Sequence, residues 1–200
     1  MLRVELDVVQ RWIAPGSRVL DLGCGDGTLL DLLKTSRDIE GYGIEIDAHK
    51  ITQCIARGIN VIEADLDQGL ADFPAKSFDT VLMTNSLQVL RRPDRTIAEM
   101  LRIGRECVVT FPNFGNIRTR LSLIARGRMP VTRQLPYQWY DTPNIHFCTV
   151  NDFEDLCRQL GTRILDREFV GEQFPDQLLQ AAWPNLFCAT AVYHLATGCI

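Results

Sequence analysis

The sequence lacks any C-x-x-C pair, although seven of its 200 residues are cysteines. Zinc sites and disulfide frameworks need clustered or evenly paired cysteines, so the spacing and the odd number argue against both. Most of the cysteines lie inside apolar stretches, where a free thiol behaves as a small hydrophobic side chain. We therefore predict free, buried thiols in a reducing compartment and no metal site. The seven residues are Cys24, Cys54, Cys107, Cys148, Cys157, Cys188 and Cys199.

Long apolar runs and long runs of one charge are also missing. No stretch approaches the ~20 apolar residues that a membrane span needs, and residues 1–7 mix charged and apolar side chains, unlike a signal peptide. The net charge is −4 and no run of like charges is long, which argues against a surface that follows nucleic-acid phosphates. We expect a cytoplasmic protein with neither a nucleic-acid nor a membrane partner.

A hydrophobic content of 46% suits one domain, residues 1–200, with a single large core. Apolar runs that predict strands alternate with amphipathic segments that predict helices. The expected strands are 17–22, 41–46, 59–62, 78–83, 107–111, 163–170 and 186–195. The expected helices are 4–12, 28–33, 48–56, one from 93, 117–125 and one from 149. This alternation is typical of an α/β fold with a mostly parallel seven-stranded sheet, helices on both faces and an antiparallel edge.

Residues 112–148 interrupt the alternation. They are rich in proline, glycine, arginine, asparagine and aromatic residues, and only 117–125 is expected to be helical. Because an irregular segment of this length inside a domain is usually functional, we predict a lid or binding loop. Its arginines could form a solvated face or meet an acidic partner or an acyl-CoA phosphate. These arginines are Arg118, Arg120, Arg126, Arg128 and Arg133.

A glycine-rich run, DLGCGDGT at residues 21–28, follows the first strand and precedes a helix. Without side chains the backbone can turn sharply and approach a ligand closely. A dinucleotide site favours G-x-G-x-x-G, but Thr28 occupies the position of the third glycine. The acid at Asp21 would repel a phosphate and attract a cationic amino group, such as that of a methionine moiety. The candidate ligand-binding residues here are Asp21, Gly23, Cys24, Gly25 and Gly27.

Two further acids follow the second and third strands. Glu45 lies 20 residues after Gly25, where a carboxylate can accept both ribose hydroxyls of a nucleoside. Asp65, followed by Leu66, could accept a hydrogen bond from an adenine amino group while Ile46 stacks on the ring. Each acid could instead be a solvated loop residue.

Candidates for a catalytic role are fewer and less specific. Asn85 follows the fourth strand and could lie beside the reacting group or simply form a turn. Tyr140 and His146 could orient a substrate, with His146 as a general base or as a structural side chain. The aromatic residues Trp139 and Phe147 could line a pocket, anchor a partner protein or pack the lid onto the sheet.

Taken together, these motifs resemble those of class I S-adenosylmethionine (SAM)-dependent methyltransferases, over essentially the whole chain. More narrowly, the segments FPNFG at 111–115, GRMPVT at 127–132 and LPYQWYDTPNIH at 135–146 resemble the methionine biosynthesis protein MetW family. The resemblance implies a Rossmann-like fold, SAM or S-adenosylhomocysteine as cofactor, and a bacterial protein that works beside a homoserine O-acyltransferase of the MetX type.

The sequence leaves three functions open. In the first, the domain binds SAM and docks on the acyltransferase, raising its activity; the missing catalytic base favours this role. In the second, it is an active methyltransferase on an unidentified small acceptor, since alignment alone can supply much of the rate. In the third, it is a nicotinamide-dependent oxidoreductase, which the glycine spacing and Asp21 oppose.

Overall fold

The computed structural model of the protein describes residues 2–132, 135–171 and 176–198. For residues 2–5 it describes the backbone alone, and from Leu6 onward it describes the side chains as well. Within these ranges the strands form one seven-stranded sheet in the order β3-β2-β1-β4-β5-β7-β6. The strands are β1 (Arg18–Leu22), β2 (Glu40–Glu45), β3 (Asn60–Glu63), β4 (Phe78–Thr84), β5 (Gly104–Pro112), β6 (Thr162–Val170) and β7 (Thr190–Thr197). Five neighbouring strands are parallel, and β7 runs antiparallel to both β5 and β6, which confirms the predicted fold class.

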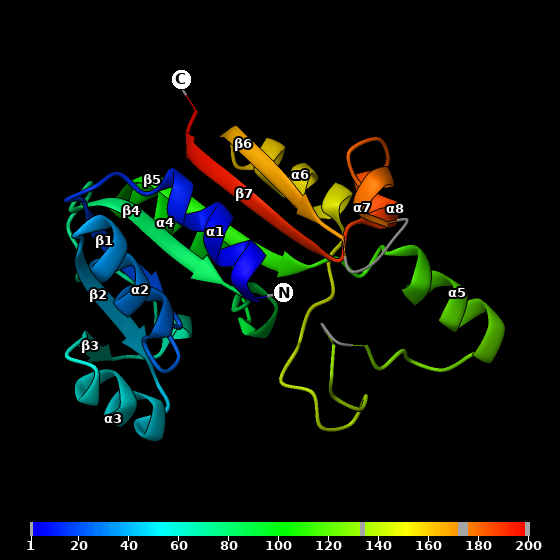
Figure 1. The fold of residues 1–200 in the computed structure, drawn as a ribbon, viewed down its shortest axis with the longest axis horizontal. Helices are drawn as coiled ribbons and strands as arrows, with labels where there is room; N and C mark the ends of the chain where they lie inside the picture. The colour runs from blue at the N-terminus through cyan, green and yellow to red at the C-terminus, as the bar shows by residue number, and fades with distance from the viewer. Residues whose placement is uncertain (1, 133–134, 172–175, 199–200) are drawn as a thin grey trace.

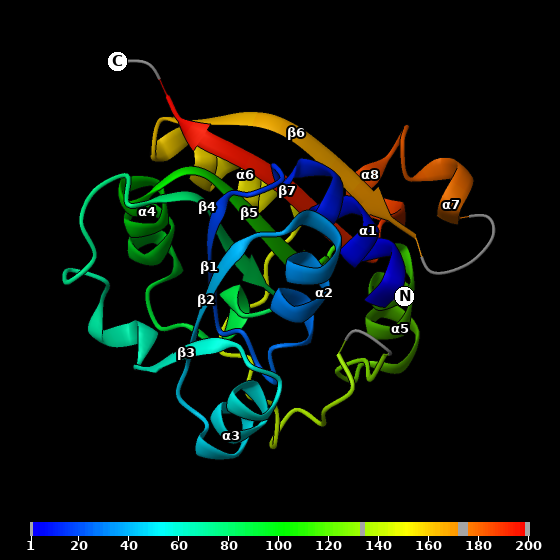
Figure 2. The same cartoon turned by 60° about the vertical axis from the view of Figure 1, so that its left-hand side comes forward.

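Helices cover both faces of the sheet (Figures 1 and 2). One face packs against α1 (Leu2–Trp12), α2 (Thr28–Arg37) and α3 (Ala48–Ala56). The other face packs against α4 (Pro93–Ile103) and α6 (Val150–Gln159). The inner strands β1, β4, β5 and β7 are buried from both sides and most of their residues are apolar. The edge strands β3 and β6 are largely exposed or half-buried and carry charged residues.

The start of the last strand was predicted too early. Leu186 was expected to lie in a strand over 186–195, but it belongs to the short helix α8 (Pro184–Phe187), and β7 begins at Thr190. Proline is well suited to the first turn of a helix, because its missing N–H would have no partner there. Periodicity alone cannot distinguish a strand from a buried helical segment in so short an apolar run.

The inward face of α3 also differs from the prediction. The helical spacing of Ala48, Ile51, Ile55 and Ala56 predicts that Ile55 lies on the packed side. Ile55 is instead 65% exposed, whereas Cys54 is fully buried. The Cys54 sulfur lies 3.9 Å from that of Cys24, and both thiols are free. Burial raises the pKa of four other thiols to about 12, so these cysteines act as small apolar side chains. These four are Cys107, Cys148, Cys157 and Cys188; Cys199 lies outside the described residues.

The segment between β5 and α6 has no strand in its described part and contains one helix, α5 (Ile117–Arg126). This helix projects away from the sheet beyond the end of β5, and the chain then returns as an irregular loop (Figure 1). The loop ends at Thr149, which caps α6 in a reciprocal hydrogen-bond pair with Asp152. A short helix, α7 (Asp176–Leu179), follows β6. No helix in the described ranges is long and apolar enough to cross a membrane.

Candidate functional site

The glycine-rich turn after β1 crosses the carboxyl end of β2. The backbone amides of Gly23 and Cys24 both donate to the Ile44 carbonyl oxygen, at 2.9 and 3.0 Å. Gly23 has a φ of +76°, and a Cβ there would lie 2.6 Å from the Ser86 hydroxyl oxygen. Gly25 has a φ of +59° with open space on its Cβ side. The turn therefore needs glycine for its conformation, and at Gly25 it leaves room for a ligand.

Asp21 is the most unusual group of the site. It lies at the end of β1, is 1% exposed and lines neither of the two cavities described below, and neither carboxylate oxygen has a hydrogen-bond partner among the described residues. Burial, and to a smaller extent the charge of Glu45, raise the pKa of Asp21 to about 7. A buried carboxylate without a partner is costly, so it needs a separate explanation. A bound cation would supply the missing partner.

Glu45 ends β2 and is held rigidly. One carboxylate oxygen accepts a hydrogen bond from the Gly25 amide at 2.9 Å. The other accepts from the amides of Ile46 at 2.9 Å and Asp47 at 3.1 Å. The carboxylate thus bridges the glycine turn and the start of the β2–α3 connection. Its remaining lone pairs are fixed in space and can accept hydrogen bonds from vicinal hydroxyl groups.

Two cavities meet at this turn. The first has a volume of about 430 Å³, and its lining includes Glu45, Ile46, Asp65, Leu66 and Pro143. The second has a volume of about 230 Å³ and is lined in part by Leu6 and Val9 of α1, the glycine turn and Thr110. Gly23 and Asn85 line both cavities. The pair offers one elongated cleft at the carboxyl ends of the parallel strands, where open α/β sheets bind ligands.

The predicted adenine-side residues lie where the sequence places them. Ile46 is 61% exposed and forms part of the wall of the first cavity. Asp65 lines the same cavity, but its carboxylate also accepts from the Asp67 amide at 2.9 Å and so caps a 3₁₀ turn at Leu66–Gln68. The capping role fixes the carboxylate and leaves further acceptor capacity for a ligand. Among the predicted glycines, Gly27 is the exception: it is buried and caps α2, and it lines neither cavity.

Two of the three predicted catalytic candidates do not reach the cleft. Tyr140 is 70% exposed and packs edge-on against Trp139. The His146 ring contacts the Arg91 carbonyl oxygen at 3.3 Å, and the His146 amide donates to the Gln88 carbonyl. Neither side chain lines the two cavities, so their predicted contact with a substrate stays a prediction. Phe147, which was a further candidate for a pocket or an interface, packs its ring against Phe114.

Asn85 is the candidate that reaches both cavities, and its backbone is in the left-handed region with a φ of +54°. We expect Asn85→Ala to lower stability by roughly 1–2 kcal/mol, the usual cost of this conformation for an L-residue with no compensating side chain. Asn85→Gly should keep the backbone geometry and lose only the side chain. Thermal unfolding of both variants measures the cost of the backbone conformation. If the Asn85 side chain also contacts a ligand of the cleft, Asn85→Gly should bind that ligand more weakly.

Several site residues were not predicted from the sequence. Leu6 and Val9 come from a helix that is far from the glycine turn in sequence. Asp26 lines the second cavity, and its pKa is lowered because its carboxylate accepts hydrogen bonds from Thr28 and lies near Arg57. Ser86 could have been found, since it follows Asn85 at the end of β4. In the part of the chain that is described, no group of His, Cys, Asp or Glu side chains is arranged to hold a metal ion.

Solved structures with this fold include several methyltransferases. A SAM-dependent methyltransferase from Archaeoglobus fulgidus is similar with a TM-score of 0.71 and 17% identity, covering 97% of this chain and 92% of that one. Magnesium protoporphyrin IX methyltransferase from Synechocystis PCC 6803, solved with bound S-adenosylhomocysteine, has a TM-score of 0.68 and 19% identity, covering 98% and 84%. The fold is therefore that of class I SAM-dependent methyltransferases.

The sequence comparisons are more specific. A family model described as methionine biosynthesis protein MetW matches residues 3–195. The bifunctional methionine biosynthesis protein MetXA/MetW of Rhodopirellula baltica is 33% identical over 201 residues, which is 96% of this chain and 32% of that protein. The chain spans between about a third and a half of the length of the curated relatives it matches. With a methyltransferase fold and a match along almost its whole length, the chain belongs to the methionine biosynthesis protein MetW family.

Proposed function

We propose that the cleft binds SAM or S-adenosylhomocysteine. The observation that carries this proposal is the buried carboxylate of Asp21, whose two oxygens have no hydrogen-bond partner among the described residues. A desolvated carboxylate at the base of a glycine turn is well matched to the α-ammonium group of a methionine moiety. An adjacent, prearranged carboxylate at Glu45 suits ribose hydroxyls, and a cavity with an exposed Ile46 suits a flat base.

The residues divide between the two halves of this ligand. Asp21 and the turn over Gly23–Gly25 would hold the methionine half, and Glu45 the ribose. Ile46, Asp65 and Leu66 would hold the adenine. When bound, SAM supplies a methyl group activated by its sulfonium charge. The protein's own residues bind and orient the ligand, and Asp21 would bind its cation best when deprotonated, because only the carboxylate carries the complementary charge.

We further propose that the domain acts in methionine synthesis by binding a homoserine O-acyltransferase of the MetX type and raising its turnover. Two observations support this role. The R. baltica relative is a single protein described as both MetXA and MetW. One source of such fused proteins is a pair of genes whose products assemble with each other. The titratable side chains of the second cavity are also unsuited to accept a proton: burial raises the pKa of Cys24, so the thiol stays protonated, and Thr28 and Arg57 lower the pKa of Asp26, so its carboxylate is a weak base.

The direct test is the effect of this protein on the acyltransferase encoded in the same genome. Addition of the purified chain is expected to raise acyltransferase turnover in a saturable way, and SAM is expected to change the concentration needed for half the effect. The factor by which SAM changes the affinity of the chain for the acyltransferase should equal the factor by which the acyltransferase changes its affinity for SAM. An acyltransferase with unchanged turnover and no measurable binding to the chain would contradict the partnership.

A second candidate function is methyl transfer to a small acceptor. It is favoured by the second cavity, whose lining extends beyond the glycine turn to the apolar residues Leu6 and Val9 of α1. An acceptor there would lie beside the end of the nucleoside cavity, and alignment alone can accelerate a displacement strongly. Incubation with SAM and a metabolite extract would then yield S-adenosylhomocysteine. Absence of that product with retained SAM binding would leave the regulatory role.

A further inference from the structure

Helix α5 exposes an apolar side that nothing in the described structure covers. Leu121 is 56% exposed and Ile124 is 81% exposed, and Thr119 is the only residue of this ten-residue helix that is fully buried. Isolated helices this short are marginal in water, and helices in proteins gain most of their stability from packing of an apolar face. A helix that packs so little of its surface is expected to gain stability from a partner.

The loop that follows α5 carries more exposed apolar side chains. Trp139 is 74% exposed, and Tyr140 is 70% exposed. Figures 1 and 2 both show this loop on the same side of the molecule as α5, beyond the carboxyl end of β5. Large aromatic side chains are the commonest anchors of protein interfaces, and exposed apolar clusters of this kind mark interaction sites. The other exposed apolar residues of the loop are Met129, Val131, Tyr137, Ile145 and Phe147.

Arginines dominate the charges of this surface, and Asp141 is the one acid in the sequence of its loop. Residues 117–132 contain four arginines and neither an acid nor a lysine, although the whole chain has a net charge of −4. Arg118 pairs with the buried Asp176 at 3.1 Å, whereas Arg120, Arg126 and Arg128 are exposed. A fitting partner therefore has an apolar surface edged with carboxylates. Arg133 lies outside the described residues.

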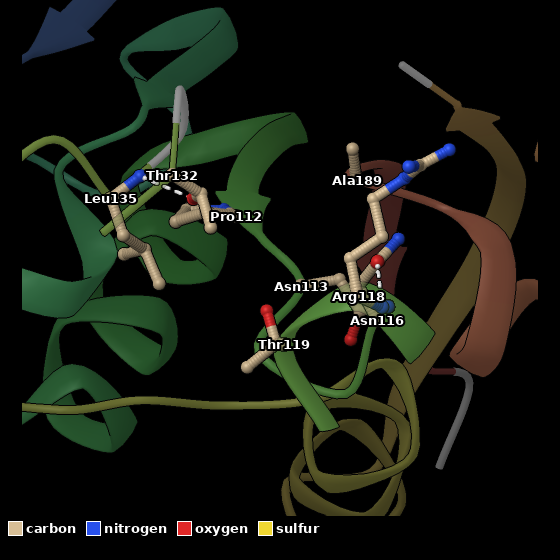
Figure 3. A pocket seen from close by; sticks show the side chains of 8 residues that line it. All are labelled: Pro112, Asn113, Asn116, Arg118, Thr119, Thr132, Leu135 and Ala189. Carbon is tan, nitrogen blue, oxygen red and sulfur yellow. Dashed lines mark hydrogen bonds between the residues drawn. The ribbon is translucent and has the colours of Figure 1, made fainter. Parts of the chain in front are cut away.

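The base of α5 is hydrogen-bonded to α8 and to the residue that follows it. The Asn113 amide group donates to the Cys188 and Asn185 carbonyls at 3.0 and 3.2 Å, and its oxygen accepts from Gly115. Asn116 also donates to Cys188 and caps α5 through the Arg118 amide. Figure 3 shows the small cavity between these residues and the returning loop. Its volume of about 30 Å³ admits a water molecule but no organic ligand. The helix is thus held at its base while its outer side stays exposed.

The loop is also tied to the proposed nucleoside cavity. Pro143 lines that cavity, and the amides of Ile145 and His146 donate to the Gln88 carbonyl at 2.8 and 3.0 Å. The Gln88 side chain in turn donates to the Asn85 carbonyl at 2.7 Å. The loop that carries the exposed aromatic side chains is therefore connected to the wall of the cleft through Pro143, Ile145 and His146.

We propose that the apolar side of α5, with the aromatic residues of the 129–147 loop, is the docking surface for the acyltransferase. We call it the α5 surface. The assignment rests on the partnership proposed above. A protein partner is favoured over a bilayer because the loop part of the α5 surface is irregular backbone, whose polar groups would be left without partners in hydrocarbon. A protein surface with acidic groups can satisfy both the backbone and the arginines.

The test compares two exposed isoleucines on helices of similar length. Ile124→Asp in α5 and Trp139→Ala change the α5 surface, and Ile55→Asp in α3 is the matched control, since Ile55 is 65% exposed and lines neither cavity. Affinity of each purified variant for the purified acyltransferase is measured together with its affinity for SAM. We expect Ile124→Asp and Trp139→Ala to weaken acyltransferase binding about tenfold or more. Ile55→Asp should bind as the wild type does, and SAM affinity should be unchanged in all three. Amide exchange in α5 should slow in the wild-type complex.

Several outcomes would overturn the assignment. Unchanged acyltransferase affinity in both α5-surface variants, with a wild type that binds, refutes the α5 surface and leaves the partnership standing. A wild type that does not bind refutes both. Protection of α5 only on phosphatidylserine vesicles would identify a membrane surface instead. Self-association of the wild type that Ile124→Asp abolishes, with acyltransferase affinity unchanged, would identify an interface between two copies.

Discussion

Asp21→Asn is expected to make the protein more stable at pH 8 while it removes most of the affinity for SAM. In the wild type the pKa of Asp21 is raised from 3.8 to about 7 by burial and by Glu45. The folded state therefore binds this proton more tightly than the unfolded state. The resulting stability is fully present below pH 4 and is lost as the pH rises to 7, by up to about 4 kcal/mol. Asparagine carries no charge at any of these pH values, so the variant escapes that loss.

The same group gives SAM binding a defined pH dependence. A cation binds the deprotonated Asp21, so wild-type affinity should fall about tenfold for each pH unit below 7. Binding at pH 6 should release close to one proton. In Asp21→Asn both the slope and the proton release should disappear. Calorimetry in buffers of different ionisation enthalpy measures the released protons, and Asp72→Asn, at an exposed aspartate, is the control. Wild-type SAM affinity in Asp21→Asn would rule out an ammonium contact at Asp21.

Glu45→Ala is expected to lower both SAM affinity and stability. The carboxylate accepts hydrogen bonds from three backbone amides and is 7% exposed. Its removal leaves these donors without their partner, which should lower the free energy of unfolding by about 2–4 kcal/mol. Loss of the ribose contacts should weaken SAM binding by roughly 100-fold, since hydrogen bonds to charged groups are each worth about 1.5–3 kcal/mol.

The matched control for Glu45 lies on the neighbouring strand. Glu63 pairs in register with Glu45 at the end of β3 and is exposed. Glu63→Ala should therefore change neither the denaturation midpoint nor SAM affinity. Glu45→Gln separates the effect of the negative charge from the effect of the hydrogen bonds, because the neutral amide loses the charge but keeps one acceptor oxygen. Denaturant titration and SAM titration of the three variants decide the matter. Weak SAM binding in Glu63→Ala, or full binding in Glu45→Ala, would show that the ribose site lies elsewhere.

The parts of the fold that were predicted correctly are those dictated by local pattern. Buried strands with continuous apolar residues, separated by amphipathic helices, leave a doubly covered parallel sheet as the natural arrangement. The predictions failed where contacts between residues that are distant in the sequence determine the local structure. Pro184 converts the start of an apolar run into a helix, and contact with Cys24 selects Cys54 over Ile55 as the inward residue of α3.

The site was predicted unevenly for a similar reason. Asp21, Gly23 and Glu45 lie at strand ends, and the ends of adjacent parallel strands meet at one edge of the sheet, so chain position was sufficient to place them. Leu6 and Val9 reach the cleft only through packing of α1 across the sheet, which no motif encodes. The segment 112–148 has no regular spacing of apolar residues from which the direction of its side chains could be predicted. Tyr140 and His146 therefore could not be placed from sequence.

The most direct test is a crystal structure of this protein soaked with S-adenosylhomocysteine. The account predicts that the α-amino group lies within hydrogen-bonding distance of an Asp21 oxygen and that both ribose hydroxyls donate to Glu45. The adenine should lie against Ile46. A cleft that stays empty at saturating ligand, or a ligand bound with Glu45 turned toward solvent, would contradict the account.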